Sequence, residues 1–222
     1  MKHGVTLYFG KSWTGKTARM IYELRDESRV ILVDPKCSQL VKLRGWQHLW
    51  PEIDPETELW TDDTLSREFA KVVHSPFKIV VHLRYCHREG LELLCRLVEA
   101  MKDCVLAVDE LGLFVPPGSA GALPRNITGV VVSGTHKGVR IVGTAQRPSL
   151  VHKTLRSNAS RMLFFRVIEK YDIDVVEGYL SKDFDVSKLP DHVCIEWQDG
   201  RDAFVDATLA GKLGKVLPGA RS

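Results

Sequence analysis

Uninterrupted apolar runs alternate along this chain with stretches in which apolar residues recur every three or four positions. Runs of the first kind are typical of strands buried on both faces, and stretches of the second kind are typical of amphipathic helices. The apolar runs cover residues 5–9, 29–35, 77–83, 104–111, 139–146 and 161–167. Strands that alternate with helices in this way predict an α/β fold with a mostly parallel central sheet and helices on both of its faces.

The helical pattern is clearest at residues 88–103, where five apolar residues recur on one side of the predicted helix. Shorter helices are predicted at 17–27, near 64–73 and at 170–180. Residues 51–68 are acidic and carry two prolines, so we expect a loop there that leads into the second helix. Residues 114–124 are too rich in Pro and Gly for a regular element and predict another loop.

Near the carboxyl terminus, two stretches of alternating apolar and polar residues flank Asp199 and Gly200. This pattern predicts a β-hairpin at residues 193–207. We therefore expect residues 1–190 to form the core domain, and residues 191–222 to form a hairpin and a loose tail that pack on or beside it.

Charge is unevenly distributed, although the net charge of the 222 residues is only +3. Between Gly134 and Lys170 there are eight basic residues and one acidic residue. Between Pro51 and Glu68 there are seven acidic residues and one Arg. A basic segment in an otherwise slightly acidic chain indicates a polyanion-binding edge, and the alternative is a set of solvated faces.

The five cysteines form no C-x-x-C pair and no zinc-like cluster, which suits a reducing compartment. Cys95 and Cys104 lie in apolar stretches and are expected in the core. The sequence shows no signal-peptide pattern, and no apolar run approaches the roughly 20 residues that cross a bilayer. We therefore expect a soluble intracellular protein without a membrane span of its own.

The segment GKSWTGKT at residues 10–17 fits the phosphate-binding pattern G-x-x-x-x-G-K-[ST] and lies between a predicted strand and a predicted helix. Gly10 and Gly15 let the backbone N–H groups approach the phosphates. Lys16 is expected to reach the β and γ phosphates, and Thr17 is expected to bind Mg²⁺. The sequence leaves open whether Trp13 stacks on a partner or only covers the loop. The predicted nucleotide-binding residues are Gly10, Lys11, Ser12, Trp13, Thr14, Gly15, Lys16 and Thr17.

Two carboxylates follow the apolar strand in VLAVDEL. Asp109 is placed to bind the metal, and Glu110 is placed to polarise a water for attack on the γ-phosphate. Kinases that phosphorylate small molecules must exclude water, so a water-activating Glu favours an ATPase. In GTAQRPS, Gln146 ends a later strand, where it can contact the γ-phosphate or the attacking water, or else simply cap the strand.

Taken in order, GKSWTGKT, ILVDPK, LAVDE, VGTAQRPS and LRSNASRMLFFRV resemble the motifs of the FtsK/HerA superfamily of hexameric DNA-pumping ATPases. The resemblance covers roughly residues 4–170 and implies a RecA-like P-loop NTPase fold that hydrolyses ATP with Mg²⁺. With its compact length, the chain looks most like the genome-packaging ATPases of tailless, membrane-containing icosahedral phages and viruses. This resemblance implies a protein located in the cytoplasm of the host cell, associated in some cases with the virion.

The resemblance also implies a homo-oligomeric ring of six or five subunits, double-stranded DNA bound without sequence preference, and contact with a capsid vertex or membrane proteins. In such rings an arginine of one subunit reaches the ATP of its neighbour. The sequence departs from the family pattern where this arginine is usual, and we rank Arg140 and Arg161 first among the candidates. Candidates for contacts with DNA phosphates are Lys137, Arg147, Lys153 and Arg156.

Three other functions stay open on the sequence. One is an ATPase of the conjugative or filamentous-phage-assembly type, and another is a P-loop nucleotide or small-molecule kinase. The third is a nucleotide-bound scaffold that does not turn over, which the intact Asp109–Glu110 pair disfavours.

Overall fold

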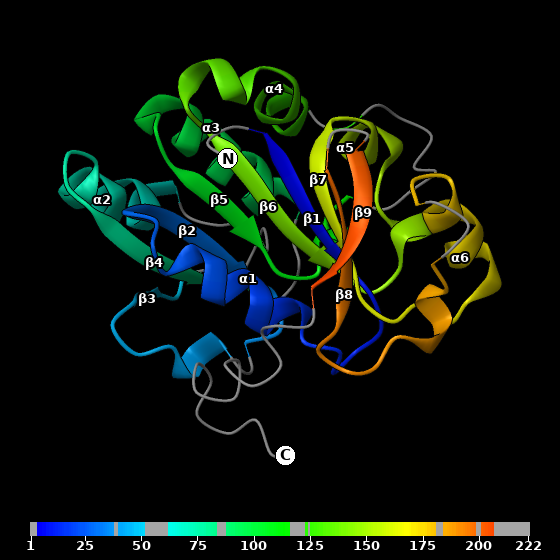
Figure 1. Cartoon of the computed structure of the whole chain (residues 1–222). Coiled ribbons are helices and arrows are strands. Elements are labelled where there is room, and N and C mark those ends of the chain that lie inside the picture. The colour runs from blue at the N-terminus through cyan, green and yellow to red at the C-terminus, as the bar shows by residue number, and fades with distance from the viewer. Residues whose placement is uncertain are drawn as a thin grey trace.

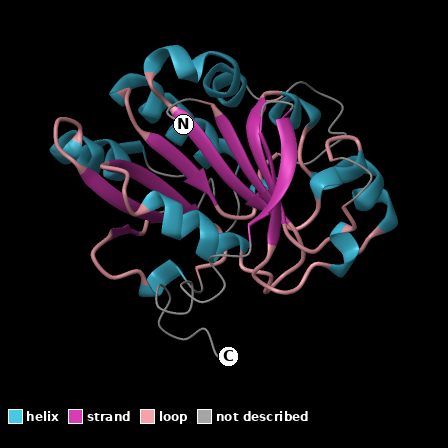
Figure 2. Ribbon diagram, viewed as in Figure 1, coloured by secondary structure: helices cyan, strands magenta, loops and turns pink. Residues whose placement is uncertain are grey.

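A single nine-stranded sheet runs through the molecule in the computed structural model (Figures 1 and 2). The structure describes residues 4–37, 40–51, 62–83, 88–115, 123, 125–180, 184–198 and 201–206. The strand order is β3-β4-β2-β5-β6-β1-β7-β8-β9. All neighbouring strands from β3 to β7 are parallel, while β8 is antiparallel to β7 and to β9. The strands are β1 (Val5–Phe9), β2 (Arg29–Asp34), β3 (Gln47–Leu49), β4 (Phe77–His82), β5 (Val105–Val108), β6 (Arg140–Ala145), β7 (Ala159–Phe164), β8 (Cys194–Gln198) and β9 (Arg201–Asp206).

The sheet is covered by helices on both faces, because the central strands are mostly apolar and alternate residues point to opposite sides. In β1, Tyr8 belongs to one apolar cluster and its neighbours Leu7 and Phe9 to the other. The Tyr8 cluster is completed by α1 (Lys16–Leu24) and by a 3-10 turn at Leu40–Lys42. The larger cluster on the other face receives α3 (Arg88–Met101) and α4 (Arg125–Ser133). These observations confirm the predicted fold class.

All six predicted apolar strands are present, with boundaries within a few residues of those expected. The predicted helices are also present, as α1, α2 (Asp62–Val72), α3 and α6 (Lys170–Glu177). Cys95 and Cys104 are buried in the core, as expected. Three described elements were not predicted, namely β3, α4 and α5 (Lys153–Ser157). The two short ones, β3 and α5, are too brief to show a periodicity, and α4 follows directly on a Pro- and Gly-rich segment.

The predicted hairpin is formed by β8 and β9, and it extends the main sheet because β8 pairs with β7. The division into residues 1–190 and 191–222 stays a prediction. Most of the predicted loops at 51–68 and 114–124, and the tail after Asp206, lie outside the described residues. None of the helices in the described ranges has the length and apolar character needed to span a bilayer.

Candidate active site at the carboxyl edge of the sheet

The predicted catalytic motifs meet at one edge of the sheet. They follow β1, β5 and β6, and β6 lies between the other two. Because these strands are parallel, their carboxyl ends share an edge, which is where ligands bind in sheets of this type. Residues far apart in the sequence are thereby brought within hydrogen-bonding distance.

The loop between β1 and α1 is tied to the strands on either side of β1. Gly10 N donates to Ala145 O at 3.2 Å, and Lys11 N donates to Arg166 O at 2.8 Å. Gly10 has φ 146°, and a Cβ there would lie 2.7 Å from the Cβ of Phe165, so only glycine fits. The backbone at Gly10 therefore adopts a conformation that a side chain would prevent, as the start of a phosphate-binding loop requires.

The second glycine of the motif lies under the segment that precedes β8. Gly15 has φ 100°, and a Cβ on it would lie 2.6 Å from His192 Nδ1. The backbone N–H of His192 donates to Thr14 O at 3.0 Å. Within the loop, the Thr14 hydroxyl donates to Lys11 O at 2.8 Å. Sequence reasoning gave no role to His192, which contacts the loop from a distant part of the chain.

Lys16 begins α1, and its ammonium group folds back over the loop and donates to Lys11 O at 2.9 Å. Burial lowers the pKa of Lys16, against the raising effect of the nearby charges of Glu110 and Asp109. The other predicted nucleotide-contacting residues differ in exposure. Ser12 is half-buried, and Trp13 is 81% exposed at a left-handed φ of 67°. Trp13 therefore projects from the loop rather than packing in the core.

Thr17 and Asp109, the two predicted Mg²⁺ ligands, are in direct contact. Thr17 Oγ1 donates to Asp109 Oδ1 at 2.8 Å, and Thr144 Oγ1 donates to the same oxygen at 2.7 Å. Burial raises the pKa of Asp109, although the two hydroxyl bonds act in the opposite direction. A threonine hydroxyl and a buried carboxylate that meet at the phosphate loop are oxygen ligands of the kind that Mg²⁺ prefers, so this pair fits the ion.

Glu110 and Gln146, the predicted base and its neighbour, are also brought together. Gln146 Nε2 donates to Glu110 Oε1 at 3.1 Å, and Lys36 Nζ donates to the same atom at 2.7 Å. Glu110 has a left-handed φ of 52°, and its N–H donates to the Thr144 hydroxyl at 2.9 Å. Thr144 and Lys36 were not predicted as site residues. Their sequence signal is positional, because each lies beside the end of a buried strand.

Of the two candidates for the arginine that reaches a neighbouring subunit, Arg161 is the more firmly held. Its Nε and Nη2 bind both oxygens of Glu196, each at 2.8 Å, and its Nη1 binds Glu23 Oε2 at 2.5 Å. Arg140 pairs with Glu27 and is the first residue of β6. It therefore lies at the amino end of that strand, away from the edge where Gln146 follows it.

The candidate DNA contacts differ in how far they are engaged within the chain. Lys137 donates to Glu99 at 3.1 Å, and Arg147 Nε donates to buried Asp172 at 2.7 Å. Arg156 donates to a backbone oxygen at 3.2 Å, while Lys153 is exposed at the start of α5. Lys137 and Lys153 are thus the two exposed residues of the four, and Lys137 is engaged by Glu99.

No protein-family model matches this sequence, and no curated protein matches it. Similar solved structures are found. The genome packaging NTPase B204 from Sulfolobus turreted icosahedral virus 2, in complex with AMP, has a TM-score of 0.70 and 14% identity, over 92% of this chain and 97% of that chain. B204 has also been solved with AMPPCP and with ATP-gammaS.

Two further structures share the fold. The N-terminal domain of zonular occludens toxin from Neisseria meningitidis has a TM-score of 0.54 and 16% identity, over 98% of this chain and 100% of that chain. The pCW3 conjugation coupling protein TcpA has a TM-score of 0.51 and 12% identity, over 97% of this chain and 64% of that chain. B204 is described as a genome packaging NTPase and as a DNA-packaging ATPase. The resemblance predicted from the sequence is thus confirmed at the level of the fold, which is that of a P-loop NTPase.

Proposed function

We propose that this protein hydrolyses ATP with Mg²⁺. The observation that carries the proposal is the meeting of Thr17 with Asp109, and of Glu110 with Gln146, beside a glycine-defined phosphate loop. A phosphate-binding loop alone serves many reactions. A carboxylate held beside it by a polar strand-end residue favours attack by water.

In the proposed reaction, different residues of this protein bind the phosphates, bind Mg²⁺ and activate the water. The loop N–H groups and Lys16 hold the phosphates, and Thr17 and Asp109 hold Mg²⁺. The bound ion supplies positive charge that offsets the charge of the phosphates. Glu110 accepts a proton from the attacking water, and Gln146 orients the carboxylate and the water. Burial of Asp109, which is 7% exposed, strengthens its interaction with a cation at this position.

We further propose that hydrolysis drives double-stranded DNA into a preformed viral capsid, as in the packaging ATPases that the chain resembles. Support comes from the segment that follows Gln146. Arg147 and the N–H of Ser149 both bind Asp172, which joins the strand end to α6, and the chain then enters α5 at the exposed Lys153. A change at Gln146 can thus be passed to a basic surface that contacts DNA phosphates.

The proposed motor is a ring of five or six subunits that works at a capsid vertex in the host cytoplasm. Of the two candidate trans-acting arginines, we propose Arg140. It pairs with the single carboxylate of Glu27, whereas Arg161 would have to break bonds to two carboxylates. A second candidate function is that of a conjugation-type ATPase, and the likeness to the conjugation coupling protein TcpA favours it.

The decisive experiment measures ATP hydrolysis with and without double-stranded DNA, across protein concentrations that allow a ring to assemble. We expect hydrolysis to rise with DNA and with protein concentration. Hydrolysis that is independent of DNA at every concentration would count against a DNA motor. Transfer of the γ-phosphate to an acceptor other than water would indicate a kinase.

A matched variant, Glu110→Gln, keeps the size of the side chain and removes the base. It should bind ATP as the wild type does and lose turnover by about 100-fold or more. Turnover at the wild-type rate would show that Glu110 is not the base.

Packaging and conjugation are then separated by adding purified capsids and measuring whether DNA becomes protected from nuclease.

A further inference from the structure

Glu110 is oriented by two donors that come from strands on opposite sides of β5. Lys36, two residues beyond β2, and Gln146, one residue beyond β6, both donate to Glu110 Oε1. The Glu110 side chain is 13% exposed and that of Lys36 is 43% exposed. One oxygen of the Glu110 carboxylate therefore accepts two hydrogen bonds, one from a cation and one from an amide.

Lys36 is delivered to this position by a turn that Asp34 builds. Asp34 Oδ1 accepts the backbone N–H of Lys36 at 3.1 Å and that of Cys37 at 3.0 Å. Asp34 is 1% exposed, so its carboxylate is an interior anchor for the turn. Local bonds of this kind fix the backbone directly after a strand, and here they fix the residue whose side chain reaches Glu110.

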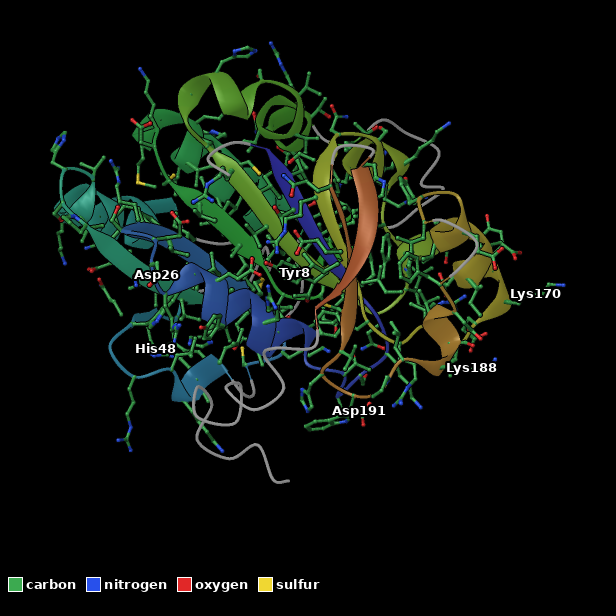
Figure 3. The ribbon with its side chains drawn as sticks, viewed as in Figure 1. Tyr8, Asp26, His48, Lys170, Lys188 and Asp191 are labelled. Atoms are coloured by element: carbon green, nitrogen blue, oxygen red, sulfur yellow. The ribbon has the colours of Figure 1, made fainter. Side chains whose placement is uncertain are left out.

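Asp34 contacts His82 on the neighbouring strand β4, and His82 in turn contacts His48 on β3. Asp34 Oδ2 lies 3.0 Å from His82 Nδ1, and His82 Nε2 lies 2.9 Å from His48 Nδ1. This series of contacts, called the Asp34–His82–His48 chain below, ends where His48 Nε2 lies 2.9 Å from Leu43 O. His82 is 2% exposed, and Trp50 stacks on its ring with the centroids 4.0 Å apart. Figure 3 labels His48, which lies in β3 at one end of the sheet.

The contacts of Asp34, His82 and His48 also limit where their protons can lie. Each of the three hydrogen bonds needs one proton, whereas a carboxylate and two neutral imidazoles carry two. The oxygen of Leu43 can only accept, so His48 Nε2 must donate. All three contacts can be hydrogen bonds at the same time only if these three side chains share a third proton. Trp50 stacks on the ring of His82.

We propose that Lys36 is a positioning residue for Glu110, and that the buried Asp34–His82–His48 chain holds Lys36 in place. The proposal rests on the proposed function, in which Glu110 is the base. Lys36 occupies one carboxylate oxygen, so the other faces the water that attacks the phosphate. A base that is held in a single orientation reacts faster than one that turns freely.

The test compares Lys36→Met and Lys36→Arg with wild type in ATP hydrolysis. Lys36→Met keeps the length of the stem and removes the charge. We expect kcat to fall about 10- to 100-fold while KM for ATP stays within about twofold, and we expect Lys36→Arg to recover most of the rate. The matched control is Lys42→Met, an exposed lysine in the 3-10 turn at Leu40–Lys42, for which no change is expected.

Each other kinetic outcome overturns the proposal in a distinct way. An unchanged kcat would show that Lys36 has no part in the reaction. A raised kcat would show that Lys36 restrains Glu110 instead of positioning it. A rise in KM equal to the fall in kcat/KM would make Lys36 a nucleotide-binding residue.

A second readout does not depend on activity, so it separates failure of this proposal from failure of the proposed function. In nitrogen-15 NMR, the Lys36 ammonium should exchange slowly with solvent in the wild type, and this signal should be lost in Glu110→Gln. The same signal in both proteins would overturn the contact, even if the wild type does not hydrolyse ATP.

The histidine chain is tested in the same spectra. We expect the ring-nitrogen signals to show a proton on His48 Nε2, as its contact with Leu43 O requires. His48→Gln should reduce kcat by the same mechanism as Lys36→Met, and the control is His74→Gln at an exposed position. A His48 Nε2 without a proton in the wild type, or an unchanged kcat in His48→Gln, would contradict the role of the Asp34–His82–His48 chain.

Discussion

The hydroxyl of Thr17 donates a 2.8 Å hydrogen bond to Asp109, although 92 residues separate the two in the sequence. This contact joins the two halves of the proposed Mg²⁺ site. In Asp109→Asn the side chain keeps its shape and loses its charge, so we expect at least tenfold more Mg²⁺ to be needed for half-maximal ATP hydrolysis. Titration of hydrolysis with Mg²⁺ measures this, and an unchanged midpoint would remove Asp109 from the site.

The same variant should not weaken the fold. Burial raises the pKa of Asp109, which means that the folded protein disfavours its charged form. An amide removes that cost and can still accept bonds from Thr17 and Thr144. We therefore expect a Tm equal to or above that of the wild type when thermal unfolding is followed without Mg²⁺ or nucleotide. A large fall in Tm would contradict this account of the buried carboxylate.

Gly10→Ala should cost stability and nucleotide binding together. The new Cβ would lie 2.7 Å from the Cβ of Phe165 at φ 146°, so the loop must move. Gly45→Ala is the matched control, because Gly45 also has a positive φ, of 80°, with no heavy atom within 4 Å of the added Cβ. We expect Gly45→Ala to cost about 1 kcal/mol and Gly10→Ala about 3 kcal/mol or more in denaturant unfolding. Equal losses would show that the phosphate loop tolerates a side chain.

Stability should fall in acid through Glu23. Burial alone would raise the pKa of Glu23, but the hydrogen bonds and charge of Arg161, with bonds from Tyr8 and Arg19, outweigh it and hold the pKa below 4.5. The unfolded chain then binds the proton more readily, so this stabilisation is present above about pH 4.5 and is lost as the pH falls through the folded value.

Glu23→Gln separates this contribution from those of other carboxylates. We expect it to lower the free energy of unfolding at pH 7 by on the order of 2 kcal/mol, because it removes charged hydrogen bonds to Arg161. The difference from the wild type should shrink as the pH is lowered below 4.5, since protonated Glu23 resembles Gln. Chemical unfolding at several pH values measures both, and a difference that is independent of pH would exclude Glu23 as the titrating group.

DNA affinity should depend on Lys153 through phosphate contacts. In Lys153→Gln, the slope of log affinity against log salt should fall by about 0.9, which is the effect of one lost phosphate contact. Lys188→Gln is the control, because Lys188 is 84% exposed and lies at the periphery beside Asp185 (Figure 3). Equal slopes for wild type and Lys153→Gln would place the DNA elsewhere.

The central sheet could be predicted because its strands are mostly apolar and end at marked residues such as Gly10 and the Asp109–Glu110 pair. The site motifs could be placed because parallel strands bring their carboxyl ends together. The roles of Thr144, Lys36 and the two histidines could not be predicted. A threonine inside a strand looks like any β-former, and His48 and His82 show their partnership only when β3 and β4 are aligned.

The ion pairs of Arg161 also could not be predicted from the sequence. The sequence ranked Arg161 first, with Arg140, for the arginine that reaches the ATP of a neighbouring subunit, whereas the fold pairs it with Glu23 and Glu196 of its own chain. Long-range ion pairs of this kind depend on the sheet order, since β7 lies between β1 and β8. Charge counted along the sequence does not reveal them.

One consequence of that ion pair concerns hydrogen exchange. Arg161 binds Glu23 on α1 and Glu196 on β8. It therefore links the helix that carries Lys16 and Thr17 to the first strand of the carboxyl-terminal hairpin. Opening either element first requires the same guanidinium to be released. We therefore expect the amides of α1 and β8 to open together and to exchange with deuterium at matched rates.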